Sequence, residues 1–183
     1  MKKSVFYLCF LLFQFINFLA AQQLGVYKTE LDFIQNQIFP DSGASKLQSN
    51  TVFSNTIIAH KNGIKYCFKK DSIFGYNHKT GSFRCNHLDK QDYQIMENGN
   101  VVIYMIMEPT YGYKNFVLKP QYYFSLNLSS PILPLSIINI KRAFPENERL
   151  HHFLDIDFYQ KEISMYNSTY NTYQINYLIN KYK

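Results

Sequence analysis

Residues 93–107, YQIMENGNVVIYMIM, decide the fold, because they read as a strand, a tight turn and a second strand. The turn falls at residues 97–100, where Asn and Gly accept the backbone angles that a hairpin turn needs. From Val101 to Met107 every residue is apolar or tyrosine, so the second strand is apolar on both of its faces. A strand of that kind is buried on both sides, and we expect it at the centre of an antiparallel sheet.

Further hairpin signals flank this stretch. Asn62 and Gly63 separate the strand-like runs IIAHK and IKYCFKK, and Asn-Gly is a strong signal for a two-residue turn. Residues 72–86, SIFGYNHKTGSFRCN, predict another hairpin that turns at residues 79–81. On the C-terminal side, residues 121–128, QYYFSLNL, alternate in the way that an edge or half-exposed strand does.

Helices are predicted at both ends of the chain. Thr29, with Asp32 three residues later, predicts a short amphipathic helix that ends before Pro40, and the polar residues 41–50 predict a loop. The C-terminal helices are predicted over residues 137–144 behind the N-cap Ser136, over 146–154 and over 172–182. The fold class is therefore α+β: an antiparallel β-sheet built from consecutive hairpins, with a short N-terminal helix and C-terminal helices packed on it.

The first 23 residues, MKKSVFYLCFLLFQFINFLAAQQ, have the three parts of a secretory signal peptide. Two lysines precede an apolar run, and the small residues Ala20 and Ala21 follow it. The run is shorter than the roughly 20 apolar residues that a membrane-spanning helix needs. We therefore expect cleavage after Ala21, with no transmembrane anchor left. No repeat or linker divides residues 22–183, which are predicted to form a single domain.

The charge of the chain excludes one class of partner. The whole chain has 19 basic and 13 acidic residues, a net charge of +6. Loss of Lys2 and Lys3 with the leader lowers this to +4, an ordinary solubility charge for a small domain. The basic runs are pairs such as Lys69-Lys70, too short to follow a phosphate backbone. The sequence therefore predicts no nucleic-acid partner.

Cys67 and Cys85 remain after the expected cleavage, and export would place them where disulfides form. Two alternatives stay open: a disulfide between them, or two separate thiols that behave as small buried hydrophobes. The hairpin arrangement places a strand between the two residues, which favours separate thiols.

The densest polar segment is ERLHHFLDIDF, residues 148–158. On a helix, Glu148 lies one turn from His152, and His151 lies one turn from Asp155. A carboxylate beside an imidazole suits a metal ion, or the proton transfer of a small hydrolase. Ordinary charge pairing on an exposed helix produces the same spacing, and the paired histidines of the HExxH motif are missing.

Other catalytic signatures are missing from the sequence, which has no G-x-S-x-G and no GxxxxGK[ST] motif. No cofactor is predicted. The C-terminal tyrosines predict either a stacking surface for sugar rings or peptides, or half-buried residues where the last helices dock on the sheet. These tyrosines are Tyr159, Tyr166, Tyr170, Tyr173, Tyr177 and Tyr182.

Several short segments together resemble a group of uncharacterised exported proteins from Bacteroidetes-type bacteria. These segments are GVYKTELDF at residues 25–33, IFGYNHKTGSFRC at 73–85, PLSIINIKRAFPENERLHHFLD at 134–155 and YNTYQINYLI at 170–179. The group is similar in its opening motif, which here is G-V-Y-x-T-x-x-D-F, and in a Gly-Tyr hairpin that ends in Arg. Phe83 departs from the tyrosine that is usual before this Arg. The resemblance implies export and a common small fold, a domain of unknown function, and no assigned catalytic residues.

Arg84 is the candidate binding residue of the second hairpin. It has a structural explanation, an ion pair with a carboxylate such as Asp89 or Asp92. It also has a functional one, because a guanidinium held beside Tyr76 and Phe83 suits an anionic ligand. The structural explanation is the more economical.

Together these features predict an exported bacterial protein, periplasmic or secreted, that binds a protein or glycan at the cell envelope without catalysis. Two alternatives stay open. One is a small periplasmic hydrolase or metal-dependent enzyme that uses His151, His152 and Asp155. The other is an immunity or inhibitor protein, which would fit the same size and export.

Overall fold

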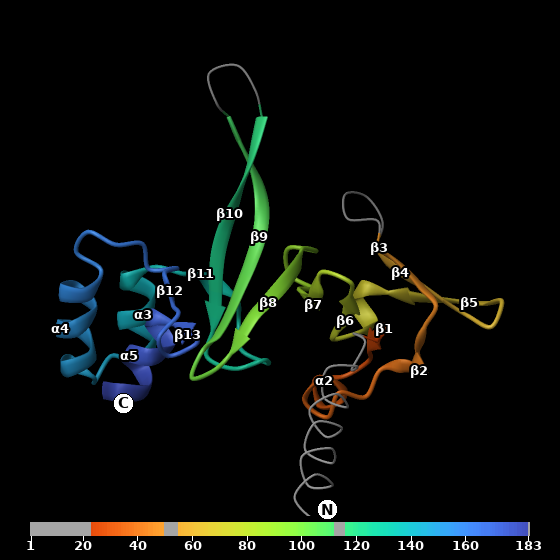
Figure 1. Ribbon diagram of the computed structural model, residues 1–183, viewed down its shortest axis with the longest axis horizontal. Coiled ribbons are helices and arrows are strands. Elements are labelled where there is room, and N and C mark those ends of the chain that lie inside the picture. Colours follow the sequence, from red (N-terminus) through yellow and green to blue (C-terminus); the bar gives the residue numbers. More distant parts are fainter. Residues whose placement is uncertain (1–22, 50–54, 112–115, 183) are drawn as a thin grey trace, which may run out of the picture. The chain divides into compact units, whose positions relative to one another are not determined.

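The computed structural model describes residues 23–49, 55–111 and 116–182, whose helices and strands are shown in Figure 1. The chain divides into two compact units, residues 1–81 and 82–183. The predicted leader lies outside the described residues, and the prediction of a single domain over residues 22–183 stays a prediction. Within the described ranges, no helix is long and apolar enough to cross a membrane.

The first unit consists mainly of short antiparallel strands. Its elements are β1 (Leu24–Tyr27), α2 (Glu30–Ile34), β2 (Phe39–Ala44), β3 (Lys46–Ser49), β4 (Thr56–Lys61), β5 (Ile64–Lys69), the 3-10 turn η1 (Lys70–Ser72) and β6 (Gly75–His78). Strand β1 pairs with β2 on one side and with β6 on the other, while β3, β4 and β5 pair in that order.

Helix α2 begins where the sequence predicts it and ends sooner. The Thr29 side chain accepts a hydrogen bond from the Asp32 backbone at 3.1 Å, and the Asp32 carboxylate accepts one from the Thr29 backbone at 2.9 Å. This capping box confirms the predicted N-cap. The helix stops at Ile34, because Asn36 adopts a positive φ of 52°. Its apolar residues Leu31 and Ile34 are 57% and 60% exposed, so the expected amphipathic face is not buried.

The Asn62–Gly63 turn is confirmed, with positive φ at both residues and β4 and β5 on either side. The loop predicted over residues 41–50 is wrong, because β2 and β3 occupy most of that range. Polar side chains do not prevent strand pairing, since the ladder joins backbone groups, and β3 pairs with β4 from Lys46 to Ser49.

The second unit holds a twisted antiparallel sheet and the C-terminal helices. Its strands are β7 (Gly81–Cys85), β8 (Asp92–Asn98), β9 (Val102–Tyr111), β10 (Phe116–Ser125), β11 (Leu133–Pro134), β12 (Tyr166–Asn167) and β13 (Thr172–Tyr173), and its helices are α3 (Ile137–Ala143), α4 (Glu148–Asp157) and α5 (Gln174–Tyr182). Strands β7 to β11 pair in chain order, and β12 pairs with β13. The predicted α+β class is confirmed.

The hairpin predicted over residues 93–107 is formed by β8 and β9, and β9 lies between β8 and β10. This central position is the one expected for a strand that is apolar on both faces. Residues 101–104 are at most 1% exposed. The turn predicted at residues 79–81 is also found, since β6 ends at His78 and β7 begins at Gly81.

The C-terminal helices cover one face of β9 and β10 (Figure 1). Ile103 and Phe124 lie opposite each other on that face, and both are fully buried. The helices contribute Ile140, Leu150, Leu154, Ile175, Leu178 and Ile179 to the same cluster. The predicted N-cap Ser136 is confirmed, since its side chain accepts a hydrogen bond from the Asn139 backbone at 3.2 Å. Helix α5 begins at Gln174, two residues later than predicted, because Thr172 and Tyr173 form β13.

Candidate functional site

Arg84, the candidate anion-binding residue, is half-buried on β7 and belongs to a hydrogen-bond network inside the second unit. Its guanidinium donates to the Tyr104 hydroxyl at 2.9 Å and to the Ser130 carbonyl at 3.1 Å, with a longer contact to the Ser125 hydroxyl at 3.5 Å. These partners tie β7 to β9, β10 and the segment that follows β10. The geometry therefore fits the structural explanation for Arg84.

The partner expected for Arg84 is wrong, because neutral oxygens replace the carboxylate of Asp89 or Asp92. Asp89 instead accepts a 2.6 Å hydrogen bond from the Tyr93 hydroxyl. Burial, followed by this bond to Asp89, raises the pKa of Tyr93. The spacing of residues along the sequence could not reveal that hydroxyls from distant strands, those of Tyr104 and Ser125, would contact the Arg84 guanidinium in place of the nearby carboxylates.

The aromatic residues proposed to flank Arg84 lie on different strands. Tyr76 is on β6 in the first unit and is 1% exposed, so its ring offers no face to a ligand. Phe83 is on β7 in the second unit and is half-buried. The structure thus places Phe83 next to Arg84 along one strand and Tyr76 on another strand, with its side chain buried.

The candidate metal residues on α4 do not converge. Asp155 pairs with the Lys141 ammonium, whose Nζ is 2.7 Å from each carboxylate oxygen. The His151 Nε2 donates to the Phe144 carbonyl at 2.8 Å, which stabilises the end of α3. Among residues 23–49, 55–111 and 116–182, no group of three His, Cys, Asp or Glu side chains is placed to hold a metal ion, Glu148 and His152 included.

The two cysteines also lie in different units. Cys67 is exposed on β5, Cys85 is buried on β7, and both carry reduced thiols in the structure. The exposed position of Cys67 differs from the buried thiol that the second alternative expected, and whether the two cysteines form a disulfide stays a prediction.

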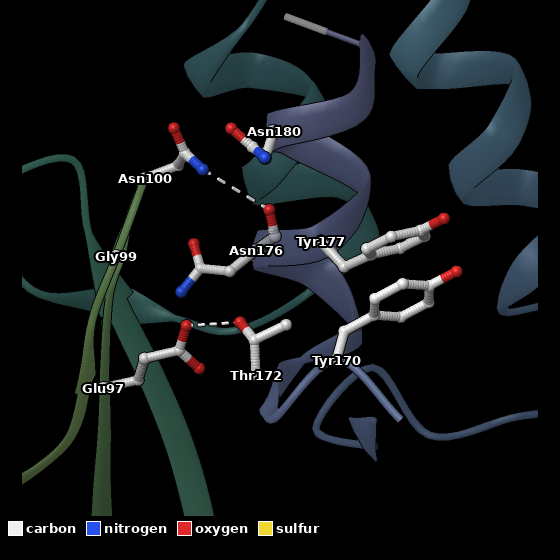
Figure 2. Close-up of a pocket in the computed structure, with 8 residues that line it drawn as sticks. All are labelled: Glu97, Gly99, Asn100, Tyr170, Thr172, Asn176, Tyr177 and Asn180. Carbon is white, nitrogen blue, oxygen red and sulfur yellow. Dashed lines mark hydrogen bonds between the residues drawn. The ribbon is translucent and has the colours of Figure 1, made fainter. Parts of the chain in front are cut away.

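A pocket of about 350 Å³ lies where the β8–β9 turn meets α5, and Figure 2 shows its lining. The lining consists of amide, hydroxyl and aromatic side chains with a single carboxylate: Glu97, Gly99, Asn100, Tyr170, Thr172, Asn176, Tyr177 and Asn180. All of these residues belong to the second unit. We take this pocket as the candidate functional site and call it the amide–tyrosine pocket.

Asn176 is the residue that holds the pocket together. Its side-chain oxygen accepts a hydrogen bond from the Val101 backbone at 2.9 Å, and its side-chain nitrogen donates to the Val101 carbonyl at 3.0 Å. Asn176 is 3% exposed, so the bridge lies in the interior. A β-carbon on Gly99 would approach the Asn176 nitrogen to 2.6 Å, and the turn therefore requires glycine there.

The pocket carboxylate, Glu97, is engaged within the chain. One of its oxygens accepts a hydrogen bond from the Thr172 hydroxyl at 2.5 Å, and the other accepts one from the Tyr173 backbone at 2.7 Å. These bonds join the β8–β9 turn to β13 and so set the position of the first turn of α5. Glu97 therefore positions the turn and α5. The amide and tyrosine side chains of the pocket are the groups that could contact a ligand.

Two tyrosines form the aromatic side of the pocket. The rings of Tyr170 and Tyr177 are stacked, with centroids 4.3 Å apart and planes at 16°, and Figure 2 shows their hydroxyls pointing the same way. Tyr170 remains 56% exposed although one face of its ring is covered. The hydrogen bond with Tyr177 raises the pKa of Tyr170, and the Lys181 ammonium lies 5.6 Å from the centre of the Tyr177 ring.

The two explanations offered for the C-terminal tyrosines both apply, at different positions. Tyr173 is 6% exposed and packs in the core, while Tyr182 stacks on Phe153 with ring centroids 4.0 Å apart. Tyr159 is 82% exposed, and Tyr166 is half exposed. Among these residues, Tyr170 combines an exposed ring with a place in a pocket.

Sequence reasoning placed residues 97–100 in a turn and gave them no further role. Their partners are Thr172 and Asn176, and the Val101–Asn176 bond spans 75 positions. A single sequence gives no signal for such a pair, because the residues around the turn do not indicate which distant side chain will contact it.

No family model matches the chain, and neither a curated protein nor a solved structure matches it. The resemblance to exported Bacteroidetes proteins therefore stays a prediction.

Proposed function

We propose that the protein is an exported, non-catalytic module that binds a saccharide at the cell envelope through the amide–tyrosine pocket. The observation that carries this proposal is the exposed Tyr170 ring, backed by Tyr177, in a pocket that the exposed amide of Asn180 also lines. A sugar ring has an apolar face of C–H groups and a rim of hydroxyls. An aromatic ring suits the apolar face, and amides both donate to and accept from hydroxyls.

The electrostatics of the pocket support a neutral ligand. Glu97 already accepts two hydrogen bonds from the chain, so its negative charge is partly compensated. Lys181 lies against the Tyr177 ring on the same helix but is not among the residues that line the pocket. A volume of about 350 Å³ is at the small end of the range for ligand sites and suits one or two sugar rings.

Backing by the chain makes Tyr170 a better platform than an isolated surface tyrosine. Stacking on Tyr177 limits the conformations of the Tyr170 ring before any ligand arrives, which reduces the entropy lost on binding. The Asn176 bridge and the Glu97 contacts hold the helix and the turn that carry these side chains. The site is thus built on ordered elements.

Titration calorimetry with soluble peptidoglycan fragments and neutral oligosaccharides tests the proposal. We expect binding by the wild type and a loss of at least about tenfold in affinity for Tyr170→Ala, because one stacking contact is removed. Tyr159→Ala is the matched control, since Tyr159 is 82% exposed and lies outside the pocket. Absence of binding to every saccharide, or an equal loss in Tyr159→Ala, would overturn the proposal.

Export is tested separately. Expression of the whole chain in a Gram-negative host should yield a periplasmic or secreted protein whose N-terminus is Gln22. Recovery of the intact 21.7 kDa chain from the cytoplasm alone would contradict export.

A further inference from the structure

Strands β3, β4 and β5 form a three-stranded antiparallel sheet in the first unit (Figure 1). Residues that pair across such a sheet point to the same face, and successive pairs alternate between the two faces. The register is regular over all of β3, β4 and β5, so it assigns every side chain of these strands to one face or the other.

One face of this sheet is apolar and packed. Phe39 of β2 contacts the rings of Tyr66 and Phe68 edge-on, with centroids 5.2 and 5.5 Å from its own. The face also carries Leu47, Ile57 and Ala59, which are at most 6% exposed. Burial of this face turns the opposite face of the three strands outward.

The opposite face is basic. Its first row across the sheet is Lys46, His60 and Lys65, and Lys69 lies at the far end of β5. We call it the basic face, and it consists of Lys46, Gln48, Thr56, Ile58, His60, Lys65, Cys67 and Lys69. None of these residues is acidic.

The chain does not neutralise the three lysines of the basic face. Lys46, Lys65 and Lys69 are exposed. Within the described parts of the chain, no carboxylate forms an ion pair with any of them. Asp71, the acidic residue that follows β5, accepts a hydrogen bond from the Asn55 amide at 2.7 Å. Exposed cations gathered in this way give a surface a positive potential that attracts anions.

The lysines are spread over two dimensions. Neighbouring strands lie about 4.8 Å apart, so the backbones of Lys46 and Lys65 on the two outer strands are roughly 10 Å apart. Lys65 and Lys69 are roughly 13 Å apart along β5. A single extended polyanion follows a line of cations, whereas a planar array of anionic groups contacts all three lysines at once.

Protection of the sheet edge explains only part of this pattern. Lysine on an outer strand discourages the addition of another strand, and it does so from either face of the sheet. Lys46, Lys65 and Lys69 all point to the same face, although they come from both outer strands. A flat anionic partner accounts for that common direction.

We propose that the basic face docks on an anionic lipid surface, with the ammonium groups of Lys46, Lys65 and Lys69 against the phosphates of the headgroups. Each lysine close to an anionic membrane strengthens binding by about fivefold, so three give roughly a hundredfold. Because the contact is electrostatic, salt weakens it.

This inference is independent of saccharide binding. The basic face belongs to the first unit, and every residue that lines the amide–tyrosine pocket belongs to the second. Failure of one proposal therefore leaves the other standing, and the two assays use different ligands.

Co-sedimentation of the purified protein with lipid vesicles tests the inference. The wild type should sediment with vesicles of phosphatidylglycerol and phosphatidylcholine and stay in the supernatant with phosphatidylcholine alone. The bound fraction should fall as NaCl is raised from about 0.05 M to about 0.5 M, because the Debye length shortens.

A triple variant locates the contact. Lys46→Gln, Lys65→Gln and Lys69→Gln combined should lower the partition coefficient by roughly a hundredfold. The same three lysines changed to arginine should bind as the wild type does, since arginine keeps the charge. Circular dichroism checks that both triple variants are folded.

The matched control removes the same charge from other places. Lys79→Gln, Lys90→Gln and Lys161→Gln combined change three exposed lysines outside the basic face. This variant should lose less than about fivefold, because distant charges are screened from the membrane.

Three results would overturn the proposal. One is a wild type that stays in the supernatant with the anionic vesicles. Another is an equal loss of binding in the two glutamine variants, which would place the contact elsewhere. The third is binding to soluble dextran sulfate without binding to vesicles, which would make the partner a polyanion in solution.

Discussion

Asn176→Ala is expected to destabilise the second unit more than any change at an exposed position of α5. The Asn176 amide exchanges two hydrogen bonds with the Val101 backbone, at 2.9 and 3.0 Å. Val101 is fully buried, so its N–H group has no water to replace the lost amide, while its C=O group keeps a hydrogen bond from the Gly99 N–H at 3.3 Å. A buried backbone group without a partner costs about 1 to 3 kcal/mol, and Asn176→Ala leaves one such group, the Val101 N–H.

This loss is large against the total stability of a domain, which is about 5 to 15 kcal/mol. Urea unfolding followed by circular dichroism gives the free energy of unfolding, and a thermal melt gives Tm. At about 2 to 4 °C per kcal/mol, the variant should melt roughly 2 to 12 °C below the wild type.

Asn180→Ala is the matched control for this prediction. Asn180 is exposed on the same helix, one turn further on, and its replacement by alanine should change the free energy of unfolding by less than about 0.5 kcal/mol. If Asn176→Ala cost less than about 1 kcal/mol, or no more than Asn180→Ala, the amide bridge would not have the role assigned to it.

Asn176→Asp separates the hydrogen bonds from the shape of the side chain. The aspartate keeps an acceptor for the Val101 N–H but places a second oxygen against the Val101 carbonyl. A protonated carboxyl can donate to that carbonyl, so the variant should be closer in stability to the wild type at about pH 3 than at about pH 7. An equal difference at both pH values would argue against a donor at this position.

Three further predictions follow from other sites. Burial, followed by a hydrogen bond from its hydroxyl to Glu108, raises the pKa of Tyr123 to about 12, and burial also raises that of Tyr173 to about 12. The folded state thus favours the neutral phenols of both tyrosines. Their contribution to the free energy of unfolding should persist up to pH 10 and be lost as the pH rises toward 12. Urea midpoints at each pH measure the stability, and phenolate absorbance measures the ionisation of the tyrosines. Asp155→Asn should lower the free energy of unfolding by less than about 1 kcal/mol, because the Lys141–Asp155 pair is exposed. Zinc should leave the Tm of the wild type and of Asp155→Asn unchanged, and a zinc-dependent rise in Tm would support a metal site on α4. Gly63→Ala should lower the free energy of unfolding, measured in urea, by about 1 kcal/mol, because Gly63 has a φ of +77° that alanine adopts only with strain. A clash is not the cause, since no atom lies within 4 Å of the place where the alanine β-carbon would be. An unchanged stability would contradict the turn geometry.

Much of the local structure could be predicted because it depends on residues close together in the sequence. The Thr29 and Asp32 capping box, the Asn62–Gly63 turn and the Ser136 N-cap each rest on a side chain and a backbone group within a few positions. The central place of β9 could be predicted for a related reason, since its residues are apolar on both faces.

The predictions that failed involve distant partners. Residues 41–50 contain β2 and β3 because other strands accept their backbone groups, which their polar side chains do not reveal. Arg84 meets Tyr104 and the Ser130 carbonyl across neighbouring strands instead of the carboxylates close to it in sequence. The residues on α4 that suggested a metal site make separate contacts, because a shared helix face brings side chains near each other without making them converge.

By itself, the sequence determined the α+β class, the main hairpins and the starts of α2 and α3, because period, turn chemistry and caps act over short distances. Only the tertiary structure decided which side chains form the amide–tyrosine pocket. The pocket depends on contacts between segments far apart in the chain, as in the bond from Asn176 to Val101 across 75 positions.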